Sequence, residues 1–521
     1  MADRAQPLGP LAWVGVAAAV AIPGLILATV AAILWVAEPG RGVTPSDWAA
    51  LRFTLLQAFL SALVSVSLAV PVARALARRR FPGRGALVTL LGAPFLLPVI
   101  VAIFGLLAVF GRGGLVNGVL GVFGGPEVSV FGLHGVVLAH VFFNLPLATR
   151  LILQGWQDIP AERYRLAASL GMDTAAINRH LEWPMLRQVL PGAALVIFVI
   201  CTTSFAVALT LGGGPKATTI ELAIYQALRF EFDLTRAAFL SLIQLGITVA
   251  LALLAYRAMA GVGFAAGLDR SVIRWDGRTR GVISLDFVVI GLAVLFLLLP
   301  ILSVLLRGTP EVAHLPGAVW VSALRSIAVA LASTAIVVCL ALSMALASVR
   351  LAKRGGWVET AGLMAVSASP LVMGTGLFVM IFPFANPEAL ALPVTVLVNA
   401  IVTLPFALRA LVPAYRTVEA DYGRLADSLG LTGWARMRLV ILPRLRRPLG
   451  FSAGLAAALS MGDLGVIALF ADPESATLPL QVYRLMGSYR MDEASGAAVL
   501  LLILSFALFW VFDRGARRAE V

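Results

Sequence analysis

One acidic side chain, Asp463, lies inside a long apolar run, in the segment Ser460-Met-Gly-Asp-Leu-Gly. An ionised carboxylate at such a depth costs roughly 3 kcal/mol unless it faces a partner or water. Two interpretations are open. The carboxylate lines a cavity and attracts a cationic substrate, or it caps a broken helix or pairs with an arginine. Ser204 occupies a comparable place in an earlier apolar run, and we treat both residues as candidates for a substrate path.

A glycine-rich segment, GGGPKAT at residues 212–218, is the only sequence that resembles a phosphate-binding loop. Its lysine follows a proline, and the spacing G-x-x-x-x-G-K-[ST] is absent. We interpret the segment as a turn. We therefore expect no ATP site, no bound cofactor and no catalytic residue in this chain.

Histidine and cysteine provide no metal site in this sequence. The four histidines are dispersed and form no H-E-x-x-H pattern, and Cys201 and Cys339 both lie in apolar runs. Such cysteines are typical packing residues rather than disulfide or metal ligands. We predict neither a metal centre nor an intramembrane enzyme.

The most informative stretch is written twice. RLAASLGMDTAAINRHLEWP at residues 165–184 returns as RLADSLGLTGWARMRLVILP at residues 424–443, 259 residues later and without a gap. We expect the same framework to act in both copies, and its members are Ala167, Ala168, Gly171, Asp173, Pro184, Ala426, Gly430, Thr432 and Pro443.

Each copy predicts two short helices joined by a tight turn. Gly171 and Gly430 fall where a helix ends and a positive φ is needed. Asp173 and Thr432 follow two residues later, as N-caps of a second helix. The closing prolines are expected to stop or kink that helix. The prediction is a compact helix–turn–helix on a membrane surface, with small side chains on its first helix.

Composition indicates the membrane. Apolar residues make up 60% of the 521 residues and charged residues 13%, which is too little polar material to cover a soluble globule. We predict an all-α polytopic membrane protein with about twelve transmembrane helices. They are expected near 11–36, 53–73, 86–110, 132–153, 190–212, 237–256, 282–306, 323–347, 358–382, 391–408, 450–471 and 494–512.

The basic residues predict the orientation. Of the 40 lysines and arginines, 30 lie in one set of alternate loops, with the termini, and eight in the opposite set. By the positive-inside rule, both termini and both repeated motifs are cytoplasmic. The net charge of +13 thus indicates topology and contact with anionic lipid, and we expect no nucleic acid as a partner.

Repetition beyond the motif predicts two homologous halves. NLPLATR at 144–150 returns as TLPFALR at 403–409, and TIELAIY at 219–225 as TLPLQVY at 477–483. Six predicted spans separate the copies, so both halves have the same orientation. We place the first half at 1–265 with a loop near 158–188, a cytoplasmic linker at 266–281, and the second half at 282–521 with a loop near 417–447.

A cytoplasmic loop with Ala-Ala, then Gly, then a later Pro resembles the coupling helix of permease subunits of binding-protein-dependent ABC importers. The resemblance implies a loop that docks on a separate ATPase subunit. The leading glutamate usual in that motif is displaced here, to Glu162 and Glu419, which weakens any role for these two residues.

Two copies in one chain resemble the fused permeases of thiamine and ferric-iron importers. The strings HVFFNLPLATR at 140–150, LGGGPKATTIELAIYQAL at 211–228 and GDLGVIALF at 462–470 are most similar to thiamine or thiamine pyrophosphate permeases. The resemblance implies import of thiamine or its phosphates across a bacterial inner membrane, with two ATPase copies and a periplasmic binding protein as partners. Asp463 would then attract a thiazolium ring.

Two alternatives remain at this point. A ferric-iron importer permease would have the same loops, because the binding protein holds the iron. An ion-coupled secondary transporter can also have twelve spans in two parallel halves. It would not need two matching cytoplasmic loops, and it would carry more charged residues inside its spans.

Overall fold

The computed structural model describes residues 9–37, 43–92, 96–258, 279–367, 369–470 and 474–518, which form helices and turns with no strand among them. Up to residue 258 the α-helices are α1 Pro10–Val36, α2 Pro45–Arg78, α3 Arg84–Leu90, α4 Val99–Phe110, α5 Leu115–Val122, α6 Leu133–Gln157, α7 Ala161–Ser169, α8 Thr174–Ile177, α9 Trp183–Thr202, α10 Ala206–Leu211, α11 Ile220–Arg229 and α12 Leu234–Ala258.

From residue 280 onward the α-helices are α13 Arg280–Gly308, α14 Gly317–Arg350, α15 Gly356–Leu363, α16 Pro370–Ile381, α17 Ala391–Ser428, α18 Gly433–Arg436, α19 Leu442–Met461, α20 Gly465–Phe470, α21 Leu478–Gly487 and α22 Met491–Arg518. Most of the predicted linker, 266–281, lies outside the described residues.

The fold is that of an all-α polytopic membrane protein, as predicted. Among the described residues, eleven helices are long and apolar enough to cross a membrane. The shorter helix α16 takes part of the place of the ninth predicted span. About twelve crossings therefore agree with the helices observed.

Four of the predicted spans contain a break in the helix. The run 86–110 divides into α3 and α4, and 358–382 into α15, a 3₁₀ turn and α16. Pro98 caps α4 and Pro370 begins α16, positions where a proline without an N–H is tolerated. The runs 190–212 and 450–471 divide just after Thr202 and Met461. Hydropathy alone could not show these breaks because both sides are apolar.

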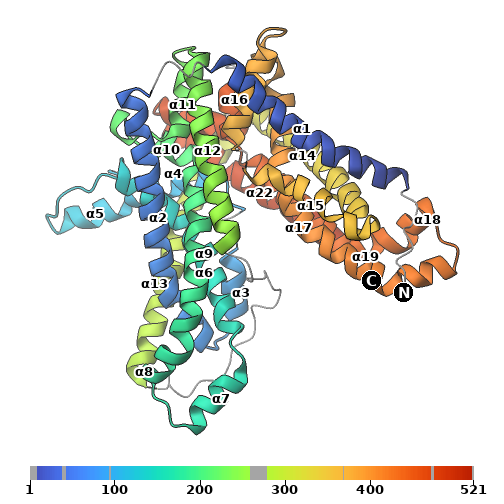
Figure 1. The fold of residues 1–521 in the computed structure, drawn as a ribbon. Coiled ribbons are helices and arrows are strands. Elements are labelled where there is room, and N and C mark those ends of the chain that lie inside the picture. Colours follow the sequence, from blue (N-terminus) through green and yellow to red (C-terminus); the bar gives the residue numbers. More distant parts are fainter. Residues whose placement is uncertain are drawn as a thin grey trace.

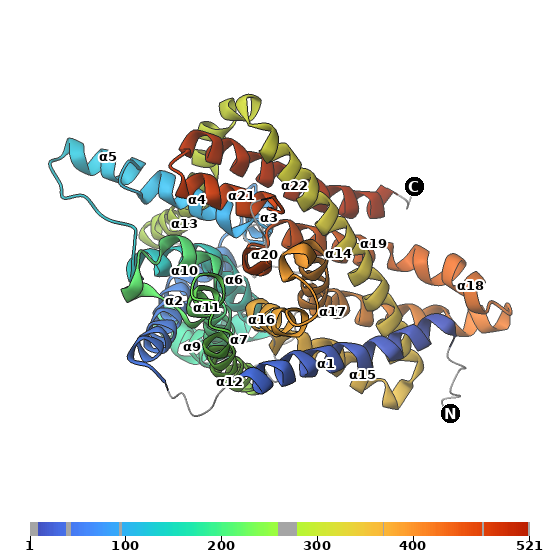
Figure 2. The same ribbon diagram turned by 90° about the horizontal axis from the view of Figure 1, so that it is seen from above.

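The first helix of each predicted half packs against the other half. Helix α1 packs on α14 and α16, while α13 packs on α4, α2 and α22. Glycines allow the closest approaches: a Cβ on Gly15 would lie 2.0 Å from the carbonyl oxygen of Ser343, and one on Gly105 would lie 2.6 Å from that of Pro300. Figure 2 shows α1 lying along the side of the molecule that contains α14 and α15.

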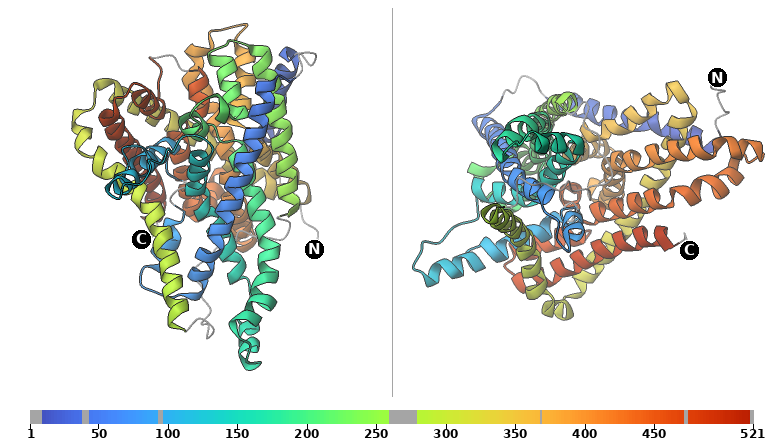
Figure 3. Two further views of the ribbon diagram at one scale, coloured as in Figure 1. Left: turned by 90° about the vertical axis from the view of Figure 1, so that its left-hand side faces the viewer. Right: turned by 90° about the horizontal axis from the view of Figure 1, so that it is seen from below.

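Two limbs of helices diverge from a common end. In Figure 1, α10, α11 and α16 lie at the upper end, α7 and α8 at the foot of one limb, and α18 at the tip of the other. The view from below in Figure 3 also separates α7 from α18. The two repeated motifs therefore lie at the far ends of the limbs.

Candidate functional site

The repeated motif forms the same turn in both copies. Gly171 has a φ of +62°, and the N–H of the next residue donates to the Ala167 carbonyl at 3.0 Å. Gly430 has a φ of +66°, and the N–H of the next residue donates to the Ala426 carbonyl at 2.9 Å. This is a Schellman helix end, which requires a left-handed backbone at its glycine. The prediction of positive φ at both glycines is confirmed.

Both predicted N-cap residues lie at the N-cap position, but only one of them makes a capping hydrogen bond. Asp173 precedes α8, and its carboxylate accepts the N–H of Ala176 at 2.8 Å. Thr432 precedes α18, but its side chain makes no capping hydrogen bond. Only the first turn therefore gains the stabilisation of a side-chain cap, which is typically about 1 kcal/mol.

Of the two outcomes expected for Pro184 and Pro443, a stop or a kink in the helix, the stop is wrong. From Thr174 and from Gly433 the chain stays helical into α9 and α19, through one π-helical turn each, at Asn178–Glu182 and Met437–Ile441. Each proline is the second residue after its π turn. A π turn widens the helix and accommodates the missing donor and the bulk of the proline ring. Each turn is thus joined directly to a long helix that enters the bundle.

The two copies differ in how they begin. In the first, α6 ends at Gln157 and α7 starts after Pro160, so α7 is a separate short helix. In the second, α17 runs 38 residues, through two internal prolines, to Ser428. The prediction of two short helices therefore fails for the second copy, whose first helix is the end of a membrane span.

The first helix of each turn presents two leucines to the outside. Leu166 and Leu170 are 60% and 63% exposed, and the matching Leu425 and Leu429 are 55% and 64% exposed. They are four residues apart, so they lie on one helical face. Each pair of large exposed apolar side chains forms a surface suited to a protein partner. Sequence analysis missed them because leucines are ordinary in an apolar chain.

The small residues of the framework divide between the interior and the surface. Ala167 and Ala426 are buried at 3% and 1% exposure. Ala168, Asp173 and Pro184 are exposed, as are Gly171, Gly430 and Thr432, and Pro443 is half-buried. The buried alanines pack the turn from within, so they cannot themselves contact a partner.

Charged pairs hold the two turns in different ways. In the second copy the buried Arg436 pairs with Glu419 and Asp427, both at 2.6 Å. Glu419, displaced from the usual motif position, therefore fixes the shape of its own turn. Residue 177 of the first copy, where the second has Arg436, is a buried isoleucine.

The first turn is fixed to another helix instead. Glu182, with no exposed surface, lies 2.8 Å from an Arg74 guanidinium nitrogen at the end of α2 and 3.9 Å from that of Arg78. The matching residue of the second copy is Ile441. Motion of the first turn is thus tied to α2 by charge, whereas the second turn is braced within itself.

Asp463 lies in the break between α19 and α20. Its Oδ1 accepts the N–H of Gly465 at 3.2 Å, so the residue caps the short helix α20, and no ion pair with an arginine is found among the described residues. Its Oδ2 is buried and accepts no hydrogen bond there. Ser204 lies partly buried in the equivalent break between α9 and α10.

Polar contacts join the helices at the opposite end from the turns. Ser369, which caps α16, donates to a carboxylate oxygen of the fully buried Glu221 on α11 at 2.6 Å. Arg229 of α11 pairs with Glu388 at 2.9 Å. Burial raises the pKa of Glu221 to about 8. These contacts connect segments about 150 residues apart in the chain.

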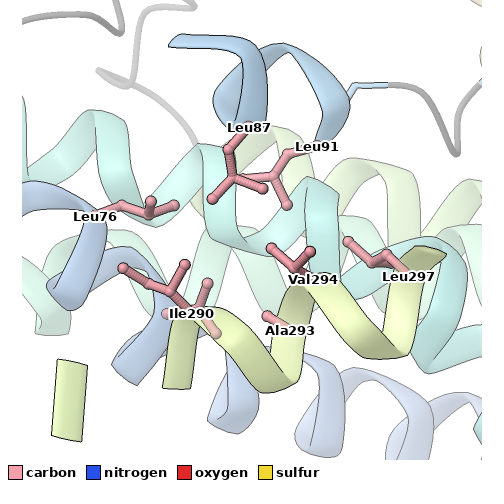
Figure 4. Close-up of a pocket in the computed structure, with 8 residues that line it drawn as sticks. Leu76, Leu87, Leu91, Ile290, Ala293, Val294 and Leu297 are labelled. Carbon is pink, nitrogen blue, oxygen red and sulfur yellow. The ribbon is translucent and has the colours of Figure 1, made fainter. Parts of the chain in front are cut away.

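The described residues enclose one small cavity and line one open groove. An apolar cavity of about 10 Å³ lies where α2, α3 and α13 meet, and Figure 4 shows that leucines of α3 and α13 point into it. It is too small and has no polar group to orient a ligand. A groove of about 420 Å³ lies beside the second turn, lined by Arg438, Leu442, Pro443, Arg446, Leu449, Gly515 and Ala516.

No family model matches this chain, but known proteins are similar to it, some over nine-tenths of its length or more. The thiamine transport system permease protein ThiP of Escherichia coli K12 is 40% identical over 530 residues, 99% of this chain and 98% of the relative. ThiP of Brucella abortus 2308 is 40% identical over 479 residues, 90% and 88% of the two chains. The sulfate transport system permease protein CysW of Escherichia coli K12 is 32% identical over 138 residues, 25% and 47%.

Proposed function

Since the chain belongs to the family of thiamine transport system permease proteins, we propose that it is the membrane subunit of an ATP-driven importer. It moves thiamine or thiamine phosphates into the cytoplasm across a bacterial inner membrane. Its partners are two copies of a cytoplasmic ATPase and a periplasmic binding protein that delivers the substrate.

The observation that carries this proposal is the matched pair of exposed turns. Each presents two leucines over a Schellman turn whose glycine has a positive φ. Both turns continue into long helices of the bundle, α9 and α19. A displacement of either turn by a bound partner would therefore move the helix that follows it. Two equal surfaces suit two copies of one partner, and we assign the loops near 158–188 and 417–447 to ATPase docking.

The internal duplication supports two halves, at 1–265 and 282–521, with the same orientation. Both π turns and the breaks at Thr203 and Gly462 recur at the 259-residue offset of the motif. Orientation rests on the basic residues, which place the turns and the chain ends in the cytoplasm.

Rigid-body rocking of two halves is the mechanism that this arrangement favours. The limbs meet near α10, α11 and α16 and diverge toward the two turns (Figure 1). With the turns cytoplasmic, this is an inward-open arrangement. ATP-driven approach of the two ATPase subunits would bring the turns together and open the opposite end.

Energy is supplied by the partner in this proposal. The glycine-rich segment 212–218 contains a short 3₁₀ turn, Pro215–Ala217, after two glycines with positive φ. It begins no long helix whose N-terminus could hold a phosphate. The proposal accordingly assigns ATP hydrolysis to the separate subunit.

The decisive experiment measures ATPase activity and uptake in proteoliposomes. The chain is reconstituted with its ATPase and binding protein, with thiamine, thiamine pyrophosphate or ferric iron as cargo. We expect no ATPase activity from the chain alone and stimulation of the complex by the thiamine-loaded binding protein. Stimulation of the ATPase activity by an iron-loaded binding protein would instead identify ferric iron as the cargo. Uptake that follows an ion gradient without any ATPase would refute the importer.

A further inference from the structure

We propose that Asp463 and Phe205 form a binding site for an organic cation at the junction of the two halves, an inference that rests on the proposed transport function. Asp463 lies in the α19–α20 break, and Phe205 lies in the equivalent α9–α10 break. Substrate sites of transporters built from repeats lie at the repeat interface, among discontinuous helices. The two breaks meet these conditions.

Gly465 marks a position that both side chains approach. A Cβ on this glycine would lie 3.8 Å from Oδ1 of Asp463 and 3.8 Å from Cδ1 of Phe205. The carboxylate and the ring therefore flank one point that carries no side chain. Leu371 of α16 lies 3.1 Å from the same point.

One carboxylate oxygen of Asp463 can still accept a hydrogen bond or an ion pair. Its Oδ1 accepts the N–H of Gly465 at 3.2 Å, and the backbone N–H groups of Val466 and Ile467 also interact with the carboxylate. Its buried Oδ2 has no hydrogen-bond donor among the described residues. Two other buried acids are paired: Asp286 lies 2.7 Å from Arg79, and Glu182 lies 2.8 Å from Arg74. A buried anionic oxygen without a donor favours an arriving positive charge.

The aromatic side of the site is held rigidly. Phe205 is 5% exposed and packs edge-on against Tyr225 of α11, with ring centroids 5.2 Å apart. A flat ring beside a carboxylate suits a cation whose charge is spread over a heteroaromatic ring, since such a cation stacks and pairs at once.

The site fits one organic charge rather than a metal ion. Within the described part of the chain, no group of three His, Cys, Asp or Glu side chains could hold a metal. The equivalent position of the first half is the uncharged Ser204, so the site has a single carboxylate. A thiazolium ring has one delocalised positive charge, and a ferric ion would need several anionic oxygens.

The experiment compares charged and uncharged cargo in the reconstituted complex. Thiamine uptake is measured against uptake of an isostere in which a neutral thiophene replaces the thiazolium ring. We expect Asp463→Asn to lower the thiamine-to-isostere uptake ratio about tenfold or more, and Phe205→Leu to lower it about fivefold. Asp463→Glu keeps the charge and should retain most of the ratio.

Control variants separate recognition from folding. Phe451→Leu removes an aromatic ring of α19 that packs on Phe509 and should leave the ratio unchanged. If Asp463→Asn or Phe205→Leu lowers uptake of both compounds equally, the residues are structural and the site is refuted. If the Asp463→Asn variant does not assemble into the complex, the thiamine-to-isostere uptake ratio of the Phe205→Leu variant decides whether the site exists. If the wild-type complex takes up neither compound, the transport function itself is wrong.

Discussion

At the scale of single residues, backbone conformation and burial decide what each position can do. Gly171 and Gly430 have open space around them, yet a positive φ. Ala167 and Ala426, which belong to the same motif, are buried inside the turn. The motif therefore combines residues that shape the turn with residues, such as Leu166, that are exposed on it.

Substituting Gly171 and Gly430 by valine should weaken ATPase docking. A β-branched residue at a positive φ costs at least about 1–2 kcal/mol, and the turn relaxes to a different shape. We expect less ATPase to co-purify and thiamine uptake to fall. Gly24→Ala, in a helix where a Cβ meets no atom, is the control. Unchanged docking with both valines would contradict the role of the turns.

Glu221 should make stability depend on pH. Burial raises the pKa of Glu221 to about 8 from its usual 4.5, and α11 lies outside the helices long enough to span. The folded chain keeps a proton that the unfolded chain releases above about pH 5. Stability should therefore fall by up to about 1.4 kcal/mol per pH unit from pH 5 to 8, then level off.

Thermal unfolding midpoints of the wild type and Glu221→Gln, measured in detergent from pH 5 to 9, test this expectation. The difference between them should change along this range, because the glutamine variant has no such proton. Parallel curves would show that Glu221 is ionised in the folded protein.

At the scale of helices, close backbone contacts hold the bundle together. Helix α1 reaches α14 because Gly15 has no side chain, and α13 reaches α4 because Gly105 has none. Ion pairs also hold the two turns in place. Glu182 fixes the first turn to Arg74 of α2, and Arg436 braces the second turn by pairing with Glu419. The two turns therefore share a shape and differ in how they transmit force.

Gly15→Leu should destabilise the protein, whereas Gly24→Leu should not. The two glycines lie in the same helix, but a Cβ on Gly15 would lie 2.0 Å from a carbonyl oxygen and one on Gly24 meets nothing. Overpacking of this kind typically costs about 1–3 kcal/mol. Size-exclusion profiles after heating should show early loss of the Gly15 variant alone. Equal behaviour would mean that α1 does not pack on α14.

At the scale of the whole molecule, the two turns lie far apart while the opposite ends of the limbs meet (Figure 1). Contacts such as Ser369 with Glu221 hold the closed end. Alternating access requires these contacts to open when the turns approach each other.

Spin labels at Ser169 and Ser428, exposed residues of the two turns, should report this motion. In the complex with its ATPase, after Cys201 and Cys339 are replaced by alanine, the distance between the labels should shorten when ATP hydrolysis is blocked. Labels at Leu166 would disturb docking and are avoided. A distance that is unchanged by nucleotide would exclude rocking of the halves.

The sequence by itself determined the membrane class, the approximate spans and the repeated motif with its two glycines. These features are local: they depend on apolar runs, turn residues and spacing along the chain. The sequence also predicted Asp463 and Ser204 as a pair of related positions, and it left open whether Asp463 caps a helix or meets a ligand.

Only the tertiary structure decided the features that depend on distant residues. Ala167 is buried and Leu166 exposed because of how α7 packs, and residues from two breaks 259 positions apart, Asp463 and Phe205, both lie within 3.8 Å of the Cβ position of Gly465. Pro184 and Pro443, which were expected to stop or kink a helix, each follow a π turn in a chain that stays helical. Apolar periodicity records which segments enter a membrane, but it carries no information on which of them touch.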